Sequence, residues 1–335
     1  MPASQPEPVI DTHAHVFLRE TLGACGSAGP ELTDPGDGPV FRAGNYAIRG
    51  VHIDDSPMSH IDQRLALMDR MGIDRQVMSP YPMLYFYDQP VTDALRFCRI
   101  HNDAMARAIS CCPQRLAGTA TLPMQSPDTA LAELTRAIDD LGLRGASIGG
   151  RFGERTLDDP AYDPLWETLA ARGLPAVVHP GPLDSSLRMV PRPWDLELII
   201  GFAADETLAV AHLVLGGVLD RHPGLRVVVP HGGGFAPYVR NRFELALDRR
   251  PGPKRCLRRS LEEVWDQMVF DCLVHDAPTL AYLVAVHGAP RVVLGTNFAA
   301  WDQDDHIVDR VRALSLPPED RAAILGSNAA ALFRL

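Results

Sequence analysis

The stretch VIDTHAHVFL, residues 9–18, combines a strand-like apolar run with two histidines that are one residue apart. Side chains alternate between the two faces of a strand, so His13 and His15 point to the same side. Two imidazoles on one side of one strand can bind a single metal ion. The stretch therefore predicts a first strand that ends in part of a metal site.

Further apolar runs of strand length follow along the chain, and segments with apolar residues three or four positions apart separate most of them. The eight predicted strands are 9–11, 75–79, 116–121, 145–148, 176–179, 227–230, 269–271 and 292–295. Apolar strands that alternate with helices are typical of a parallel sheet with both faces covered. Eight of them predict an α/β fold, the (β/α)8 TIM barrel. The alternative, an open doubly wound sheet, needs a glycine-rich turn after its first strand, where this chain has His-Ala-His.

The composition is that of an ordinary globular protein: 335 residues, 46% hydrophobic and 22% charged. We predict one domain over residues 1–335, with a Gly-, Pro- and Asp-rich loop at about 19–59 over the C-terminal mouth of the barrel. The formal net charge of −10, without a long basic cluster, argues against a nucleic-acid partner. The first residues lack a signal-peptide pattern, and the six cysteines have no zinc-ribbon or redox spacing. We therefore expect no membrane association and a cytoplasmic location.

Polar side chains also end three later strands: His179 in LPAVVHPG, His231 in LRVVVPHGGG and Asn297 in RVVLGTNFAAWD. The C-terminal strand ends of a barrel meet at one mouth, where catalysis takes place. We predict that His13, His15 and His179 hold a divalent ion, Zn²⁺ first and Mn²⁺ as the alternative. Such an ion lowers the pKa of bound water to about 7. His231 is the candidate proton donor or acceptor, because the ordinary pKa of histidine lies near neutral pH and the following glycines allow close approach.

Taken together, these residues resemble the metal-dependent amidohydrolase superfamily, in the branch of 2-amino-3-carboxymuconate-6-semialdehyde decarboxylase and aromatic acid decarboxylases. The resemblance is carried by DTHAH, HPG, HGGG and LGT, and by TLPMQSPDTALAEL, GFAADETLA, LGGVLDRHPGLRVVVPHGGG and LVHD. It implies the same roles for the three metal-binding histidines and for His231.

The resemblance also implies substrate-binding residues. Arg242 matches an arginine that binds a substrate carboxylate, and Arg42 in VFRAG matches a second, with Arg49 as an alternative. Trp194, in RPWDLELIIG, matches a tryptophan that shapes the pocket. The family tends to form homodimers, and a homodimer is expected on that ground alone.

One position departs from the family pattern, since Asn297 stands where members of the branch usually carry a metal-binding aspartate. An amide oxygen can bind an ion, so Asn297 stays in the predicted metal site, but it brings no charge and cannot act as a base. Asp302 or Asp304 in the following loop is an alternative source of a carboxylate ligand. For His275, after the strand at 269–271, a supporting role at the site and a structural role are equally open.

The leading hypothesis is a non-oxidative decarboxylase, a carbon–carbon lyase, acting on a small aromatic or unsaturated acid with an ortho amino or hydroxy group. One alternative is a hydrolase or hydratase of a lactone, amide or unsaturated diacid at the same metal. Hydrolysis asks for a base that Asn297 does not supply. The other alternative is a non-catalytic barrel that binds an anionic small molecule or a partner chain.

Overall fold

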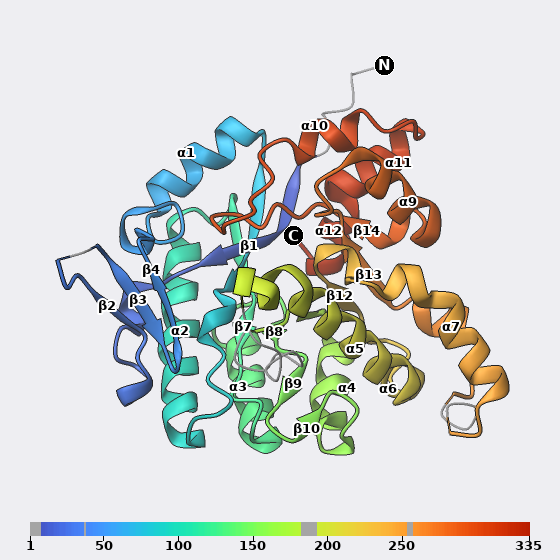
Figure 1. Ribbon diagram of the computed structural model, residues 1–335, viewed down its shortest axis with the longest axis horizontal. Coiled ribbons are helices and arrows are strands. Elements are labelled where there is room, and N and C mark those ends of the chain that lie inside the picture. The colour runs from blue at the N-terminus through green and yellow to red at the C-terminus, as the bar shows by residue number, and fades with distance from the viewer. Residues whose placement is uncertain (1–7, 37, 182–192, 253–256) are drawn as a thin grey trace.

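Parallel strands linked by helices form the centre of the molecule (Figure 1), and the computed structural model describes residues 8–36, 38–181, 193–252 and 257–335. Every predicted strand is present. The strands are β1 (Ile10–Val16), β5 (Arg75–Pro80), β6 (Leu116–Gly118), β7 (Ala120–Thr121), β8 (Ala146–Ile148), β11 (Ala176–Val178), β12 (Val227–Val229), β13 (Met268–Asp271) and β14 (Val292–Val293). β6 and β7 together make the predicted strand 116–121, with an interruption at Thr119.

The strands pair in chain order and close on themselves. One sheet has the order β1-β5-β6, the other has the order β14-β13-β12-β11-β8-β7, and the chain runs from β6 directly into β7. The Thr12 amide donates to Leu294 O (2.9 Å) and the Phe298 amide donates to His13 O (3.0 Å), which joins β1 to the chain at and after β14. These bonds close the (β/α)8 TIM barrel that the sequence predicts.

Apolar side chains fill the barrel at the end where the strands begin. They form one buried cluster that includes Ile10, Val77, Val177, Val228, Val269, Val293 and Phe333. Burial of each such Val, Ile or Phe side chain contributes roughly 1.5–3 kcal/mol. Phe333 belongs to the last helix, α12 (Asn328–Phe333), so the C-terminal helix closes this end. The polar strand ends lie at the opposite end.

Helices surround the strands (Figure 1). They are α1 (Ile61–Met71), α2 (Val91–Cys111), α3 (Pro127–Asp139), α4 (Asp163–Arg172), α5 (Phe202–Leu215), α6 (Val218–Arg221), α7 (Ala236–Arg249), α8 (Leu261–Trp265), α9 (Ala277–His287), α10 (Ile307–Arg312) and α11 (Pro318–Ala322), besides α12. By length and composition alone, the segment Glu197–Leu215 would be long and apolar enough to cross a membrane. Because Asp205 and Glu206 of this segment are buried within the fold, we interpret α5 as a barrel helix.

The segment at about 19–59 contains more regular structure than the predicted loop. It holds a three-stranded antiparallel sheet of β2 (Glu31–Thr33), β3 (Val40–Ala43) and β4 (Tyr46–Arg49), which lies beside the barrel in Figure 1. These strands are only three or four residues long, which is too short for a clear alternation of apolar and polar residues. Seven residues of this segment line the cavity described below: Tyr46, Ala47, Ile48, Arg49, Val51, Ile53 and Met58.

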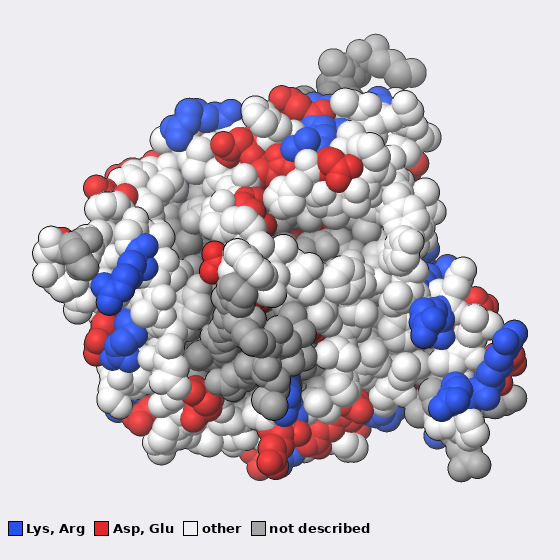
Figure 2. Space-filling model, in the orientation of Figure 1, with Lys and Arg blue, Asp and Glu red and all other residues white. Residues whose placement is uncertain are grey.

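Figure 2 shows the charges on the same face of the molecule. Lys and Arg side chains are scattered among Asp and Glu, and the coloured part of this face has no continuous basic surface. Residues 253–256, which include Cys256 and part of the short basic run KRCLRR at 254–259, lie outside the described residues. The five cysteines within the described residues are free thiols.

Candidate metal centre and active site

A cavity of about 750 Å³ opens at the C-terminal ends of the strands. The polar side chains that line it include His15, His179, His231, His275, Asn297 and Asp302. Left-handed backbone is concentrated here, since five of the seven non-glycine residues with positive φ in the described ranges line this cavity. Such strained conformations are typical of functional sites.

The structure brings His13, His15 and His179 together. The three side chains are buried, and a ligand atom from each lies within 4.8 Å of the other two. His13 Nε2 is 3.3 Å from His15 Nε2, and the ring of His179 is 5.2 Å and 5.0 Å, centroid to centroid, from those of His13 and His15. Two strands, β1 and β11, therefore supply three imidazoles to one point, as the period of the first strand predicts.

Each of the three rings is held through Nδ1. His13 Nδ1 donates to Asp271 Oδ2 (2.6 Å), His179 Nδ1 donates to Pro180 O (2.7 Å), and His15 Nδ1 lies 3.2 Å from Ser79 Oγ. These contacts leave the Nε2 atoms for a metal ion, and within the described residues the buried His179 Nε2 has no hydrogen-bond partner. Burial, helped by the neighbouring histidines, holds the pKa of His15 and of His179 well below the ordinary value. Imidazoles that are held through Nδ1 and that bring their Nε2 atoms together fit a divalent ion.

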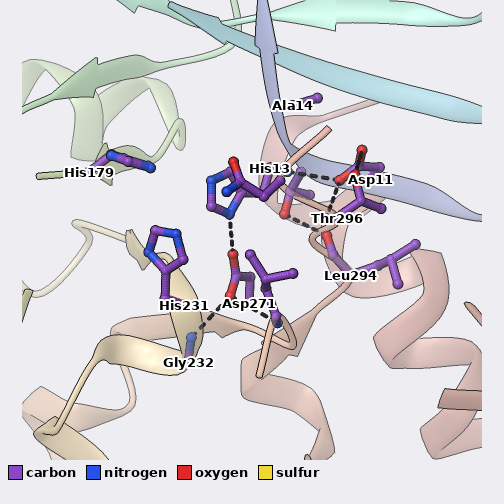
Figure 3. Close-up of polar contacts among 12 residues, drawn as sticks. Asp11, His13, Ala14, His179, His231, Gly232, Asp271, Leu294 and Thr296 are labelled. Atoms are coloured by element: carbon purple, nitrogen blue, oxygen red, sulfur yellow. Dashed lines mark hydrogen bonds and ion pairs between the residues drawn. The ribbon is translucent and has the colours of Figure 1, made fainter. Parts of the chain in front are cut away.

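Asp271, at the end of β13, binds the His13 ring on the side of Nδ1. It was not identified as a site residue from the sequence. Figure 3 shows it between the His13 ring and the backbone of Gly232. Its Oδ1 accepts from the Gly232 amide (3.0 Å) while its Oδ2 accepts from His13. A Cβ on Gly295 would lie 2.7 Å from Asp271 Oδ2, so only glycine fits beside this carboxylate. A signal was available, because Asp271 ends a predicted strand just as the histidines do.

His231 stands beside the three histidines, with its ring centroid 4.9 Å from that of His13 and 5.3 Å from that of His179 (Figure 3). Its Nδ1 donates to Glu206 Oε1 of α5 (2.6 Å). Burial alone lowers the pKa of His231, but the Glu206 carboxylate outweighs burial and raises it to about 9. Burial raises the pKa of Glu206 to about 7. Glu206 was not identified from the sequence, although it lies in the motif GFAADETLA.

The glycines after His231 allow the loop to pack closely. A Cβ on Gly234, which has φ of +60°, would lie 2.1 Å from Ala203 O, and a Cβ on Gly233 would meet the Phe270 ring at 2.6 Å. The loop is thereby held against α5 and β13, the elements that carry Glu206 and Asp271. The glycine run therefore places His231 between its two acidic neighbours.

Asn297 lies at the same end of the barrel, on the segment after β14. Its side chain is buried and its backbone has φ of +50°. Its Nδ2 donates to Asp302 Oδ1, and its buried Oδ1 has no partner within the described residues. His275 Nε2 lies 3.4 Å from the other oxygen of Asp302. The second alternative, Asp304, does not line the cavity, and both of its oxygens accept from Arg310 (2.7 Å each).

The residues predicted to bind substrate do not line the cavity, with the exception of the alternative Arg49. Arg42 does not line the cavity, because Glu31 lies opposite it in the β2–β3 ladder and the two side chains pair at 2.7 Å. The alternative, Arg49, does line the cavity. Trp194 is 79% exposed and Arg242, on α7, is also exposed, and neither lines the cavity of its own chain.

The chain matches the model of the amidohydrolase family over residues 10–335. It is 34% identical over 242 residues to 2-amino-3-carboxymuconate-6-semialdehyde decarboxylase of Dictyostelium discoideum, a match that covers 71% of this chain and 66% of that relative, just under two thirds. It is 29% identical over 292 residues to gamma-resorcylate decarboxylase of Rhodococcus jostii (strain RHA1), over 82% of this chain and 87% of that protein.

A solved structure of 2,6-dihydroxybenzoate decarboxylase complexed with 2,6-dihydroxybenzoate superposes with a TM-score of 0.78 at 25% identity, over 98% of this chain and 100% of that one. The family model covers nearly the whole chain, including every strand of the barrel and all of the histidines described above. The chain therefore belongs to the amidohydrolase family, as its sequence resemblance predicts.

Proposed function

We propose that this chain is a metal-dependent, non-oxidative decarboxylase of a small aromatic or unsaturated carboxylic acid with an ortho amino or hydroxy group. The observation that carries the proposal is that one cavity holds two distinct groups of histidines. Three histidines bring ligand nitrogens to within 4.8 Å of one another, and His231, paired with Glu206, stands beside them as a separate proton carrier. The relatives reported above, which are named decarboxylases, support this assignment.

His13, His15 and His179 would hold the ion, for which we propose Zn²⁺, with Mn²⁺ as the alternative. When bound, the ion would act as a Lewis acid that polarises an oxygen or nitrogen substituent of the substrate. The chain itself provides the orientation of the rings, because Asp271 and the Pro180 carbonyl fix the tautomers of His13 and His179. Apolar side chains such as Met58, Tyr81 and Phe202 line other parts of the cavity and exclude water from the ring of the substrate.

His231 carries the proton in this mechanism. Its Nε2 donates a proton to the carbon that bears the carboxylate, and the bond between that carbon and the carboxylate then breaks. Carbon dioxide leaves, the electron pair of the broken bond returns to the ring, and His231 regains a proton from solvent. Glu206 accepts a hydrogen bond from Nδ1–H throughout, which keeps Nε2 directed away from α5 and favours the protonated ring that the first step needs.

We assign Arg49, rather than Arg42, to the substrate carboxylate. Arg49 lines the cavity and Arg42 does not. A guanidinium can hold a carboxylate through two parallel charge-assisted hydrogen bonds. Orientation by Arg49 would place the scissile bond against His231 before the proton moves.

A role for Arg242 requires a second subunit, since this residue is exposed on α7 and does not line its own cavity. We propose a cytoplasmic homodimer in which Arg242 reaches the substrate of the partner. Light scattering measures the assembly state. Mixing the Arg242→Ala and His231→Ala variants tests the role, because restored activity requires one complete site built from two chains.

The decisive experiment begins with elemental analysis of protein that has been loaded with Zn²⁺ or Mn²⁺. The loaded protein is then incubated with aromatic and muconate-type acids, including 2,6-dihydroxybenzoate, and carbon dioxide release is measured. We expect about one ion per chain and release that depends on both the metal and His231. Hydrolysis of lactones or amides without carbon dioxide release would overturn decarboxylation in favour of the hydrolase. A protein that binds no ion and acts on no acid would be a binding protein.

A further inference from the structure

An amide and a carboxylate lie side by side in the cavity that holds the proposed metal site. Asn297 Nδ2 donates to Asp302 Oδ1, and both residues line the cavity that holds the histidines. The other oxygen of Asp302 faces His275 Nε2 at 3.4 Å. Asp302 is thus held from two sides, and only 16% of its side chain is exposed.

The hydrogen bond determines which way the amide of Asn297 faces. An ionised carboxylate only accepts hydrogen bonds, whereas an amide offers two N–H donors on one side and an oxygen acceptor on the other. The nitrogen must therefore face Asp302, and the oxygen must face away from it. That oxygen is buried and has no partner among the described residues, which is an expensive arrangement unless another group binds it.

The charge balance of the site also favours a cation beside the amide oxygen of Asn297. Three imidazoles and one amide would bring no negative charge to a divalent ion, and Asp302 places a negative charge one hydrogen bond away from that amide. Asp304, the other acid of the loop, cannot do this because Arg310 occupies both of its oxygens. Groups just outside the ligand set orient the ligands and tune the affinity for the metal.

We propose that Asn297 and Asp302 act as one unit in which the amide oxygen of Asn297 binds the metal ion and Asp302 holds that oxygen in place while supplying the missing negative charge. The inference rests on the metal site of the proposed function. Asp302 is a positioning residue in this unit, because it acts on the metal through Asn297.

The test is the affinity for Zn²⁺ alone, measured by competition with a chelator in three variants. Asp302→Asn allows the amide of Asn297 to turn and removes the charge, so we expect the dissociation constant to rise about 10- to 100-fold. Asn297→Asp brings two carboxylates within hydrogen-bonding reach of each other, and their repulsion offsets the gain of a charged ligand. The double exchange Asn297→Asp/Asp302→Asn restores one carboxylate beside one amide and should return the affinity close to that of the wild type.

Asp305→Asn is the matched control, because Asp305 is exposed on the same loop and accepts a hydrogen bond from Gln303 instead. It should leave the affinity unchanged. Circular dichroism and thermal unfolding of the metal-free variants test whether each one folds. The visible spectrum of the Co²⁺-loaded protein reports the ligand set directly, and it should change in Asp302→Asn and recover in the double exchange.

The outcomes separate the two proposals. A wild-type protein that binds one ion, with a folded Asp302→Asn variant of equal affinity, would overturn the role of Asp302 and leave the proposed function standing. A double exchange that binds no better than Asp302→Asn would also overturn it. A wild-type protein that binds no ion at all would overturn the metal site and this unit together.

Discussion

The pair Glu206 and His231 allows a quantitative test, in which Glu206→Gln removes a charge without changing the shape of the side chain. Glu206 Oε1 lies 2.6 Å from His231 Nδ1; Glu206 is fully buried, and 19% of the His231 side chain is exposed. Glutamine keeps an oxygen that can accept the hydrogen bond from Nδ1–H. The variant therefore isolates the electrostatic effect of the carboxylate on the imidazole.

The magnitude follows from the pKa of His231. Burial lowers this pKa, but Glu206, with smaller contributions from Asp271 and Asp302, raises it from the ordinary 6.5 to about 9. Each pKa unit corresponds to about 1.4 kcal/mol, so the carboxylates together favour the imidazolium by roughly 3 kcal/mol or more. In Glu206→Gln the two largest effects that raise the pKa of His231 are gone and only the smaller ones of Asp271 and Asp302 still oppose burial, so the pKa should fall toward 6.5. At pH 8 the protonated fraction should fall from about nine-tenths to a few hundredths, or roughly thirtyfold.

The first assay is a histidine NMR titration of the metal-free protein, in which the His231 signal is identified by its absence from His231→Ala. The second is the pH profile of kcat in the metal-loaded enzyme. The raised pKa keeps His231 protonated up to high pH. When Glu206→Gln lowers this pKa, activity should therefore fall first on the alkaline side of the profile. Glu244→Gln, an exposed change on α7, is the control and should alter neither measurement. A His231 signal that still titrates near pH 9 in Glu206→Gln would refute the reasoning.

Other predictions concern the metal, the proton carrier and the carboxylate. His231→Ala should abolish carbon dioxide release while one ion per chain remains bound, as elemental analysis will check; retained turnover would mean that another group carries the proton. Removal of the ion by a chelator should abolish activity without unfolding the protein, because the barrel core is closed by apolar side chains; a large fall in the unfolding temperature would contradict this. Arg49→Ala should raise KM about 10- to 100-fold, the loss of charge-assisted hydrogen bonds worth roughly 1.5–3 kcal/mol, whereas Arg42→Ala should leave KM unchanged; the opposite result would return the substrate role to Arg42.

The barrel and its three central histidines could be predicted because their signals are local. A strand alternates its side chains with a period of two, and that alone places His13 and His15 on one side. The C-terminal ends of parallel strands meet at one mouth, which brings His179 and His231 to the same place. The apolar strands and the helices between them were recognised from short windows of sequence. Each of these steps depends on residues that are close together in the chain.

The partners of these histidines depend on contacts between distant segments. Glu206 meets His231 across 25 residues, and Asp271 meets His13 across 258. No local pattern connects such pairs. Whether Arg42 or Arg49 faces the cavity was likewise decided by the pairing of β2 with β3, which places Glu31 opposite Arg42. Strands this short give little sequence signal for their pairing.

The sequence by itself determined the fold class, the metal-binding type of the site and the unusual amide at position 297. Only the tertiary structure decided which acids hold His13 and His231, and that Asp302 lies against Asn297. The physical reason is that side-chain direction along a strand follows from backbone geometry within a few residues. The distance between two side chains on different elements depends instead on the packing of the whole barrel.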